Sequence, residues 1–363
     1  MKIAIDFRIF GTKPGGIGRY NQKLLEELIK IDHENEYILL FKEDPELSLP
    51  KNFHIQICDC QWYSLKEQFV IPYTLYQINP DLVYFPHFNV PIFYSGKFVV
   101  TIHDLIMTKF PSQRATTHSK VFFKLKYWFY NQVIRHAVIN AEKIIAVSKF
   151  TAKDIKEYFD LNDQENQKIE VVYEGVSSMV ASQKEAYNLP EKYFLYVGNA
   201  YPHKNLDFLV EAFDDFSKKH PEYKLILVGN KNYFYKRLEK NTKNQNVIIV
   251  GHVADDLLAS YYKNAKAYVF PSLYEGFGLP PLEAMAHDIP VLSSNSSCLP
   301  EILEDSVLYF DPKDKNDLLD KMEEIISQSQ LKLELIKSGR EHIKKYSWEK
   351  MGKNILDIFQ NLV

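Results

Sequence analysis

Residues 271–286 constrain the fold more than any other part of the chain. They read Pro-Ser-Leu-Tyr-Glu-Gly-Phe-Gly-Leu-Pro-Pro-Leu-Glu-Ala-Met-Ala and follow a short apolar run at 267–270 that is typical of a buried strand. A turn at Gly276 and Gly278 then leads toward two prolines, which are favoured in the first turn of a helix. A strand, a glycine turn and a helix N-terminus in succession predict a doubly wound α/β domain, whose turn can bind an anion through free backbone N–H groups.

Two glutamates flank this turn, Glu275 in the loop and Glu283 in the expected first turn of the helix. Carboxylates beside a phosphate would repel it, so we expect them to bind hydroxyl groups of a sugar and a ribose instead. A helix-capping loop with two surface glutamates would explain the same spacing. The residues around the glutamates decide between these interpretations.

The 271–286 stretch resembles the donor-binding signature of the retaining glycosyltransferases of family 4, which have the two-domain GT-B fold and include bacterial mannosyltransferases. The resemblance covers nearly the whole chain. It implies an α/β protein with two Rossmann-like, doubly wound parallel-sheet domains facing a central cleft. We expect an acceptor-side domain at 1–176, a nucleotide-sugar-binding domain at 177–344, and a terminal helix at 345–363 that crosses back to the first domain. In the signature itself, the resemblance assigns donor contacts to Glu275, Phe277, Gly278, Leu279 and Glu283.

A second glycine turn follows the first predicted strand, residues 2–6. It contains Gly15, Gly16 and Gly18 and precedes a helix with apolar residues at helical spacing. The turn lacks the G-x-G-x-x-G spacing of dinucleotide-binding loops, so a flexible β–α turn is an equal alternative. The resemblance places Gly16 over the donor diphosphate, where Arg19 could add a positive charge on the acceptor side.

His103 and Asp104 end the buried run 98–102. Ligands collect at the carboxyl ends of parallel strands, so a His-Asp pair is well placed there, although a lone histidine at a strand end is often structural. The resemblance implies that His103 approaches the anomeric centre of the donor sugar and that Asp104 lies in the acceptor cleft.

Lys204 is the residue expected to bind the donor phosphates. It follows the predicted strand 193–197 at a strand-to-helix junction, and its spacing from Gly198 matches the donor-phosphate lysine of the family. Many relatives carry an arginine directly after this glycine or directly before the lysine, where this chain has Asn199 and His203. A second cation for the phosphates would therefore have to come from His203 or from the acceptor-side arginine.

Two further predicted strands end near Gly229 and Val253, positions that receive the nucleotide base in relatives, mostly through backbone atoms. Backbone recognition leaves little trace in side chains, so the sequence does not determine the base. The serine-rich loop 293–297 leads to a helix start near Glu301, which could face the phosphates or could simply be a well-capped helix.

Between Asp104 and Glu142 the sequence has no acidic residue. Basic residues interleaved with aromatics fill residues 109–137, and each Lys or Arg is worth about 1 kcal/mol at an anionic membrane surface. A core-packed helix with a basic outer face is the alternative. The overall formal charge of −3 gives no argument for nucleic acid. The basic residues are Lys109, Arg114, Lys120, Lys124, Lys126 and Arg135.

Three features predict a cytoplasmic protein, which the basic segment 109–137 would allow to lie peripherally on the inner face of the cytoplasmic membrane. Three cysteines are too few for a disulfide framework and suit a reducing compartment. Met1 runs straight into a strand, so we expect no signal peptide. No apolar segment approaches the ~18 residues of a membrane span.

The resulting hypothesis is a retaining transferase that moves a hexose, preferentially mannose from GDP-mannose, to a hydroxyl of a glycan or lipid-linked saccharide in bacterial cell-surface polysaccharide synthesis. The mannose assignment rests on resemblance of the 202–205 and 294–301 segments to bacterial mannosyltransferases. His103, Lys204 and Glu275 are the expected catalytic residues, with no cofactor. No metal is expected, because the Asp-x-Asp pair of metal-dependent transferases does not occur. The alternatives are a transferase of UDP-linked glucose or N-acetylglucosamine, a nucleotide-sugar epimerase on the same fold, a Rossmann dehydrogenase and a non-catalytic scaffold.

Overall fold

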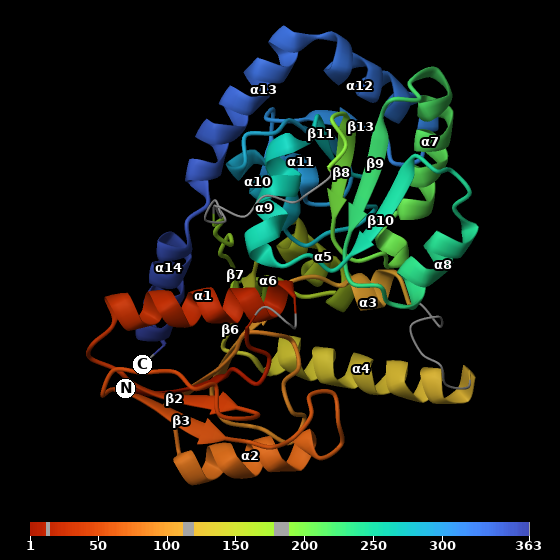
Figure 1. Cartoon of the computed structure of the whole chain (residues 1–363). Coiled ribbons are helices and arrows are strands. Elements are labelled where there is room, and N and C mark those ends of the chain that lie inside the picture. The colour runs from red at the N-terminus through yellow and green to blue at the C-terminus, as the bar shows by residue number, and fades with distance from the viewer. Residues whose placement is uncertain (12–14, 112–119, 178–188, 363) are drawn as a thin grey trace. The chain divides into compact units, whose positions relative to one another are not determined.

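The computed structural model describes residues 1–11, 15–111, 120–177 and 189–362. The chain divides into two compact units (Figure 1). Unit 1 comprises Met1–Leu105, Ser112–Gly175 and Ser347–Val363, and unit 2 comprises Ile106–Pro111 and Val176–Tyr346. Residues 178–188, at the start of the second predicted domain, lie outside the described residues.

The short segment Ile106–Pro111 belongs to unit 2, although the sequence had assigned it to the N-terminal domain. Its aromatic residue explains the difference. The ring of Phe110 lies 6.2 Å from the ring of His203 and 5.9 Å from that of Tyr274, both in unit 2. These ring contacts tie the segment to unit 2.

Unit 1 is built on a seven-stranded sheet with the order β3-β2-β1-β4-β5-β6-β7. Every neighbouring pair is parallel, as expected for strands that alternate with helices. The strands are β1 (Lys2–Asp6), β2 (Glu36–Phe41), β3 (Phe53–Ile57), β4 (Leu82–Phe85), β5 (Phe98–Ile102), β6 (Lys143–Ala146) and β7 (Ile169–Val171). The last strand of this sheet, β7, is three residues long and ends at Val171.

Helices cover both faces of this sheet, and β4 shows how they are assigned. Successive side chains of a strand point to opposite faces. Val83 and Phe85 join a core cluster with residues of α2 and α4, whereas Tyr84 contacts Tyr20 of α1 and Phe359 of α14. The helices of unit 1 are α1 (Gly16–Ile31), α2 (Glu67–Ile78), α4 (Lys120–Asn140), α5 (Lys149–Phe159), α6 (Asp163–Asn166) and α14 (Trp348–Gln360).

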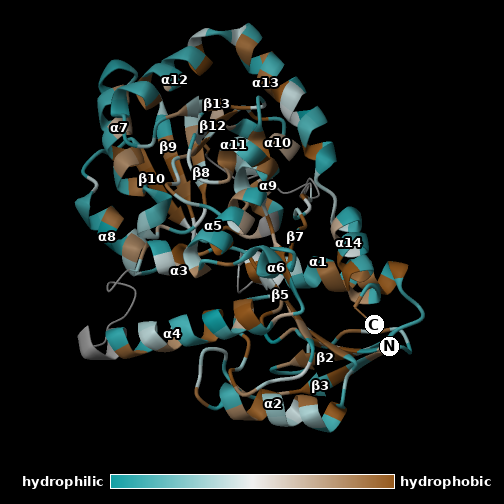
Figure 2. Ribbon diagram, turned by 180° about the vertical axis from the view of Figure 1, so that it is seen from behind, coloured by the Kyte–Doolittle hydropathy of each residue, from teal (hydrophilic) through white to brown (hydrophobic). Residues whose placement is uncertain are grey.

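Unit 2 is built on a six-stranded parallel sheet with the order β10-β9-β8-β11-β12-β13. Figure 2 shows the hydrophobic residues concentrated in the strands of both units. The strands are β8 (Tyr193–Val197), β9 (Lys224–Val228), β10 (Val247–Gly251), β11 (Ala267–Phe270), β12 (Val291–Ser294) and β13 (Leu308–Phe310). β10 ends at Gly251, so Val253 lies in the loop that follows rather than in the strand.

The connections of unit 2 are short helices that pack on this sheet. Two doubly wound parallel sheets confirm the predicted fold class. The helices are α3 (Ile106–Lys109), η2 (Pro202–Lys204), α7 (Leu206–Lys219), α8 (Tyr233–Asn241), α9 (Asp255–Asn264), α10 (Leu279–Ala286), α11 (Leu299–Leu303), α12 (Lys315–Ser327), α13 (Ser329–His342) and η3 (Ile343–Lys345).

Candidate active site

Three loops of unit 2 meet at the carboxyl edge of its sheet, because the strands β8, β11 and β12 that precede them are neighbours. The backbone N–H of Leu273 donates to the carbonyl oxygen of His203 at 2.7 Å. The backbone N–H of Glu275 donates to Oγ of Ser297 at 2.9 Å. These bonds fix the loop after β11 against the loops on either side.

Lys204 and Glu275 form an ion pair at this edge. Nζ of Lys204 donates to Oε1 of Glu275 at 2.6 Å, and both side chains are largely withdrawn from solvent. The ammonium also lies 5.5 Å from the ring centroid of Phe270 at the end of β11. A desolvated pair of this kind has a stronger field than a surface pair. The structure thus brings together two residues that are 71 positions apart and were both assigned to the donor site.

His203, directly before the lysine, is buried and uncharged. Burial, together with the charge of Lys204, lowers the pKa of His203 to about 4. The imidazole is therefore neutral near pH 7 and contributes no positive charge to a phosphate. Of His203 and Arg19, the two residues expected to supply a second cation for the phosphates, His203 is therefore disfavoured.

The glycine turn of the 271–286 stretch ends in a left-handed residue. Gly278 has a φ of 91° and is the N-cap of α10, whose first turn contains the two prolines, as predicted. Leu279 is the first helical residue. Glu283 is the fifth residue of α10, so its predicted place in the first turn is wrong, because the helix begins before the prolines. It is buried nonetheless.

Phe277 packs inside unit 2. Its ring is buried and meets the ring of Tyr346 edge-on, with 5.4 Å between centroids. The side chain is therefore engaged in the core, and a donor could use only the main chain at this position. The signature phenylalanine acts here as an anchor that holds the glycine turn in place.

Two tyrosines that the sequence did not single out hold the loop after β8. The hydroxyl of Tyr196 donates to the carbonyl oxygen of Asn199 at 2.7 Å, and the hydroxyl of Tyr235 donates to that of Gly198 at 2.9 Å. Gly229 lies beside this loop, since a Cβ on it would be 1.9 Å from the oxygen of Gly198. The predicted donor positions of β8 and β9 are thus adjacent.

In unit 1, His103 is buried at the end of β5 with both ring nitrogens hydrogen-bonded. Nδ1 lies 3.0 Å from Oε1 of Glu174, and Nε2 lies 2.9 Å from the carbonyl oxygen of Pro86. Both partners are acceptors when Glu174 is ionised, so the ring must carry a hydrogen on each nitrogen. Burial would lower the pKa of His103, but the hydrogen bond and charge of Glu174 outweigh it and raise that pKa. The sequence analysis missed Glu174, which no motif marks.

Glu174→Gln is expected to lower the pKa of His103 and to cost about 1–3 kcal/mol of folding free energy. A raised folded-state pKa means that this stabilisation is complete below the ordinary histidine pKa and is lost as the pH rises through the folded-state value. NMR titration of the His103 ring and denaturant unfolding across this range would measure both effects. Glu157→Gln, which removes an exposed carboxylate from α5, is the control. A His103 pKa below about 6.5 in the unmodified protein would contradict the assignment.

A second polar cluster, also missed, lies where β1 ends. The guanidinium of Arg8 is buried and contacts Asp6 at 2.6 Å and Glu67 at 2.5 Å, and Asn89 donates to the same Glu67 oxygen at 2.5 Å. The cavity beside this cluster encloses only about 10 Å³, which is the volume of one water-sized sphere. We therefore assign the cluster a structural role in positioning the strand ends of unit 1.

The remaining predicted residues of unit 1 lie at loop and helix starts. Gly16 is the exposed first residue of α1, and Arg19 and Asp104 are half-buried. Residues 12–14 of the same glycine turn lie outside the described residues. Within the described residues, no group of three or more His, Cys, Asp or Glu side chains is arranged to hold a metal ion.

Two units, each with a parallel sheet, have the architecture of the GT-B fold. Sucrose-phosphate synthase from Thermosynechococcus elongatus superposes with a TM-score of 0.77, covering 100% of this chain and 99% of that one at 19% identity. Anabaena HepE, solved in complex with UDP and glucose, gives a TM-score of 0.72 over 99% and 100% of the two chains at 14% identity. At these identities the likeness shows the fold.

The sequence comparisons identify the family. A model described as "Glycosyltransferase Family 4" matches residues 14–178, and one described as "Glycosyl transferases group 1" matches residues 180–342. The chain belongs to the family 4 glycosyltransferases, as the 271–286 stretch predicted.

Two curated relatives illustrate the range of this family. An uncharacterized glycosyltransferase of Methanocaldococcus jannaschii is 31% identical over 244 residues, 66% of this chain. The matched segment spans 64% of that relative, less than two thirds of its length. O-antigen chain mannosyltransferase B of Escherichia coli is 25% identical over 391 residues, covering 98% of this chain and 99% of the relative.

Proposed function

We propose that this protein transfers a hexose, specifically mannose from GDP-mannose, with retention of configuration, to a hydroxyl of a glycan or lipid-linked saccharide in cell-surface polysaccharide synthesis. The Lys204–Glu275 pair carries the proposal, because it places a desolvated cation at the carboxyl edge of a parallel sheet. The similarity to O-antigen chain mannosyltransferase B of Escherichia coli supports the choice of sugar and of pathway class.

In this reaction the bond between the anomeric carbon and the leaving phosphate breaks while a new bond to the acceptor oxygen forms on the same face. The acceptor proton passes to the leaving phosphate. Lys204 and the backbone N–H groups at the start of α10 stabilise the negative charge that develops on that phosphate. Because the lysine and the backbone N–H groups stabilise the negative charge of the phosphate, we propose that turnover needs no metal ion. Measuring activity in the presence of EDTA tests this, and the activity should be undiminished.

Glu275 has two tasks in the proposal. One carboxylate oxygen orients the ammonium of Lys204, and the group accepts a hydrogen bond from a hydroxyl of the donor sugar. Glu283 is assigned to the ribose. Both ring nitrogens of His103 are already hydrogen-bonded within the protein. The contact proposed between His103 and the donor sugar therefore uses neither nitrogen. Asp104 and Arg19 are assigned to the acceptor side.

Thermal unfolding with an excess of GDP, UDP, ADP or NAD tests the donor. A ligand at about 100 times its dissociation constant adds about 2.7 kcal/mol to the stability of the protein that binds it. We expect stabilisation by GDP and not by the other three. A response to UDP alone would keep the transferase and replace mannose with glucose or N-acetylglucosamine. A response to NAD alone, or to none, would contradict the proposal, and conversion of the donor sugar without an acceptor would indicate an epimerase.

The segment 109–137 is proposed to contact anionic lipids at the inner face of the cytoplasmic membrane. Residues 112–119 of this segment lie outside the described residues. Helix α4, which follows them, exposes Lys124, Lys126, Trp128 and Arg135. Among the described residues, no helix is both long and apolar enough to cross a bilayer. The proposed contact is therefore peripheral.

A further inference from the structure

Helix α2 of unit 1 exposes aromatic residues where a surface helix normally exposes charges. Phe69 and Tyr73 are 63% and 67% exposed, and Tyr76 is 52% exposed. The helix contains a single charged residue, Glu67, and that side chain is fully buried against Arg8. The solvent-facing side of α2 therefore carries no charge at all.

The exposed residues form one continuous surface rather than scattered positions. Their spacing of four and three residues places them on one side of the helix, in line with Leu65 just before it. Phe93, in the loop between β4 and β5, extends the surface sideways, with its ring 4.9 Å from that of Phe69. We call this surface the aromatic face: Leu65, Phe69, Tyr73, Tyr76 and Phe93. A contiguous exposed apolar surface of this kind marks an interaction site.

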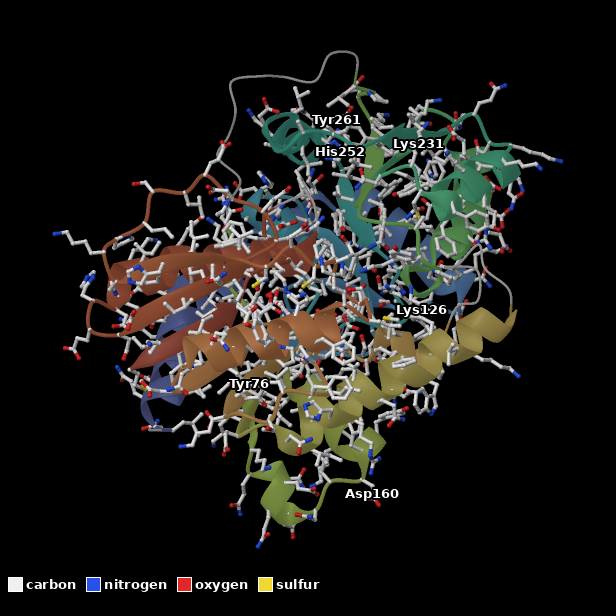
Figure 3. All side chains as sticks on the ribbon, turned by 90° about the horizontal axis from the view of Figure 1, so that it is seen from below. Tyr76, Lys126, Asp160, Lys231, His252 and Tyr261 are labelled. Atoms are coloured by element: carbon white, nitrogen blue, oxygen red, sulfur yellow. The ribbon has the colours of Figure 1, made fainter. Side chains whose placement is uncertain are left out.

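The loop between β4 and β5 joins the aromatic face to the basic helix α4. The hydroxyls of Tyr76 and Ser95 lie 3.0 Å apart, and the rings of Tyr76 and Tyr94 are 5.6 Å apart. The carbonyl oxygen of Tyr94 in turn lies 3.1 Å from Nε2 of His136 on α4. Figure 3, which views the chain from below, shows Tyr76 on α2 and Lys126 on α4 on this side of the unit.

We infer that the aromatic face lies in the headgroup region of a phospholipid bilayer, next to the basic residues of α4. Tyrosine and phenylalanine suit this region because their rings enter the acyl boundary while the tyrosine hydroxyls remain hydrated. The exposed charged residues of the described part of α4 are all cations, complementary to anionic lipid headgroups. A protein partner bound to the apolar aromatic face would not require these neighbouring cations. The inference extends the membrane part of the proposed function from α4 to an apolar contact through α2.

Flotation of the full chain with vesicles tests the inference. Vesicles of phosphatidylcholine mixed with phosphatidylglycerol should carry the unmodified protein upward. Phe69→Ser combined with Tyr73→Ser is expected to lower the partition coefficient at least about 10-fold, at both low and high salt, because apolar contact is not screened. Lys124→Gln combined with Lys126→Gln should weaken flotation at low salt only, because high salt already screens the contribution of these charges.

Tyr233→Ser combined with Leu333→Ser is the matched control. These residues are 58% and 62% exposed, close to the aromatic pair, but they lie on α8 and α13 of unit 2. The control should float like the unmodified protein, and all variants should keep its melting temperature, since the replaced side chains are exposed. Unchanged flotation of the Phe69→Ser/Tyr73→Ser variant would overturn the inference. The inference would also be overturned if the unmodified protein formed a dimer and did not bind vesicles, and if the Phe69→Ser/Tyr73→Ser substitutions dissociated that dimer. Flotation uses neither donor nor acceptor, so its outcome is separate from that of the nucleotide experiment.

Discussion

Lys204→Ala is expected to remove measurable donor stabilisation and to lower kcat/KM by about 100–1,000-fold. The ammonium is the only side-chain cation that the described structure places on Glu275, and its neighbour His203 is neutral. A developing negative charge on the leaving phosphate would therefore lose its main electrostatic partner. Thermal unfolding with and without GDP and steady-state kinetics with the donor measure the two effects.

The same substitution also destabilises the protein, and this must be separated from the effect on binding. Without Lys204 the carboxylate of Glu275 is buried without a cation, and breaking a buried pair in this way costs about 3–5 kcal/mol. The double variant Lys204→Ala/Glu275→Gln removes the unpaired charge. We expect it to regain most of the stability and none of the donor binding.

Lys218→Ala is the control for general effects of charge removal. Lys218 lies on the exposed side of α7 in the same unit and pairs with Asp215 at 2.7 Å, in a bond open to solvent. Exposed pairs of this kind contribute about 0–1 kcal/mol, so stability and donor binding should stay unchanged. If the double variant folds and still binds GDP as the unmodified protein does, Lys204 is not the phosphate residue.

The two parallel sheets were predictable because each unit consists of short apolar runs alternating with amphipathic helices. Strands such as 98–102 and 267–270 are mostly apolar and are buried along their whole length. The site residues of the 198–204 and 271–286 segments were predictable for a different reason. They come directly after such strands, and the carboxyl ends of neighbouring parallel strands meet at one edge.

The partners of these residues were not predictable. Glu174 pairs with His103 from 71 positions along the chain, and nothing around Glu174 distinguishes it from a surface glutamate. Arg8 and Glu67 form a buried pair across 59 positions with no motif at either end. Local periodicity carries information about the element in which a residue lies, but a side-chain contact depends on which strands become neighbours. The aromatic side of α2 could not be recognised from the sequence. Apolar residues at helical spacing indicate one side of a helix, but the same spacing is typical of a side that packs in the core.

Gly229→Ala is expected to destabilise unit 2 by about 3–5 kcal/mol. A Cβ at this position would lie 1.9 Å from the carbonyl oxygen of Gly198 and 2.8 Å from the ring of Tyr235. The first of these atoms belongs to the backbone, which cannot move aside as a side chain can. Denaturant unfolding would measure the loss.

The strand ends on both sides of Gly229 are held by hydrogen bonds, so the clash cannot be relieved cheaply. The N–H of Gly198 donates to the carbonyl of Val228 at 2.9 Å, and the N–H of Gly229 donates to that of Gly251 at 3.0 Å. Separating the ends of β8 and β9 would break the first bond, and the second bond ties Gly229 to the end of β10. Glycine is therefore required here for the close approach of two main chains, independently of any contact with a nucleotide base.

Gly339→Ala provides the comparison within the same unit. The nearest atoms to its Cβ would be Cγ and Cβ of Met285 at 3.0 and 3.2 Å, which need to move by a few tenths of an ångström. The glycine lies inside α13, where alanine favours the helix by about 1 kcal/mol. The two effects nearly cancel, so stability should change little. If Gly229→Ala were as stable as Gly339→Ala, the ends of β8 and β9 would have to be further apart than described, and the requirement for glycine at 229 would have to come from the donor.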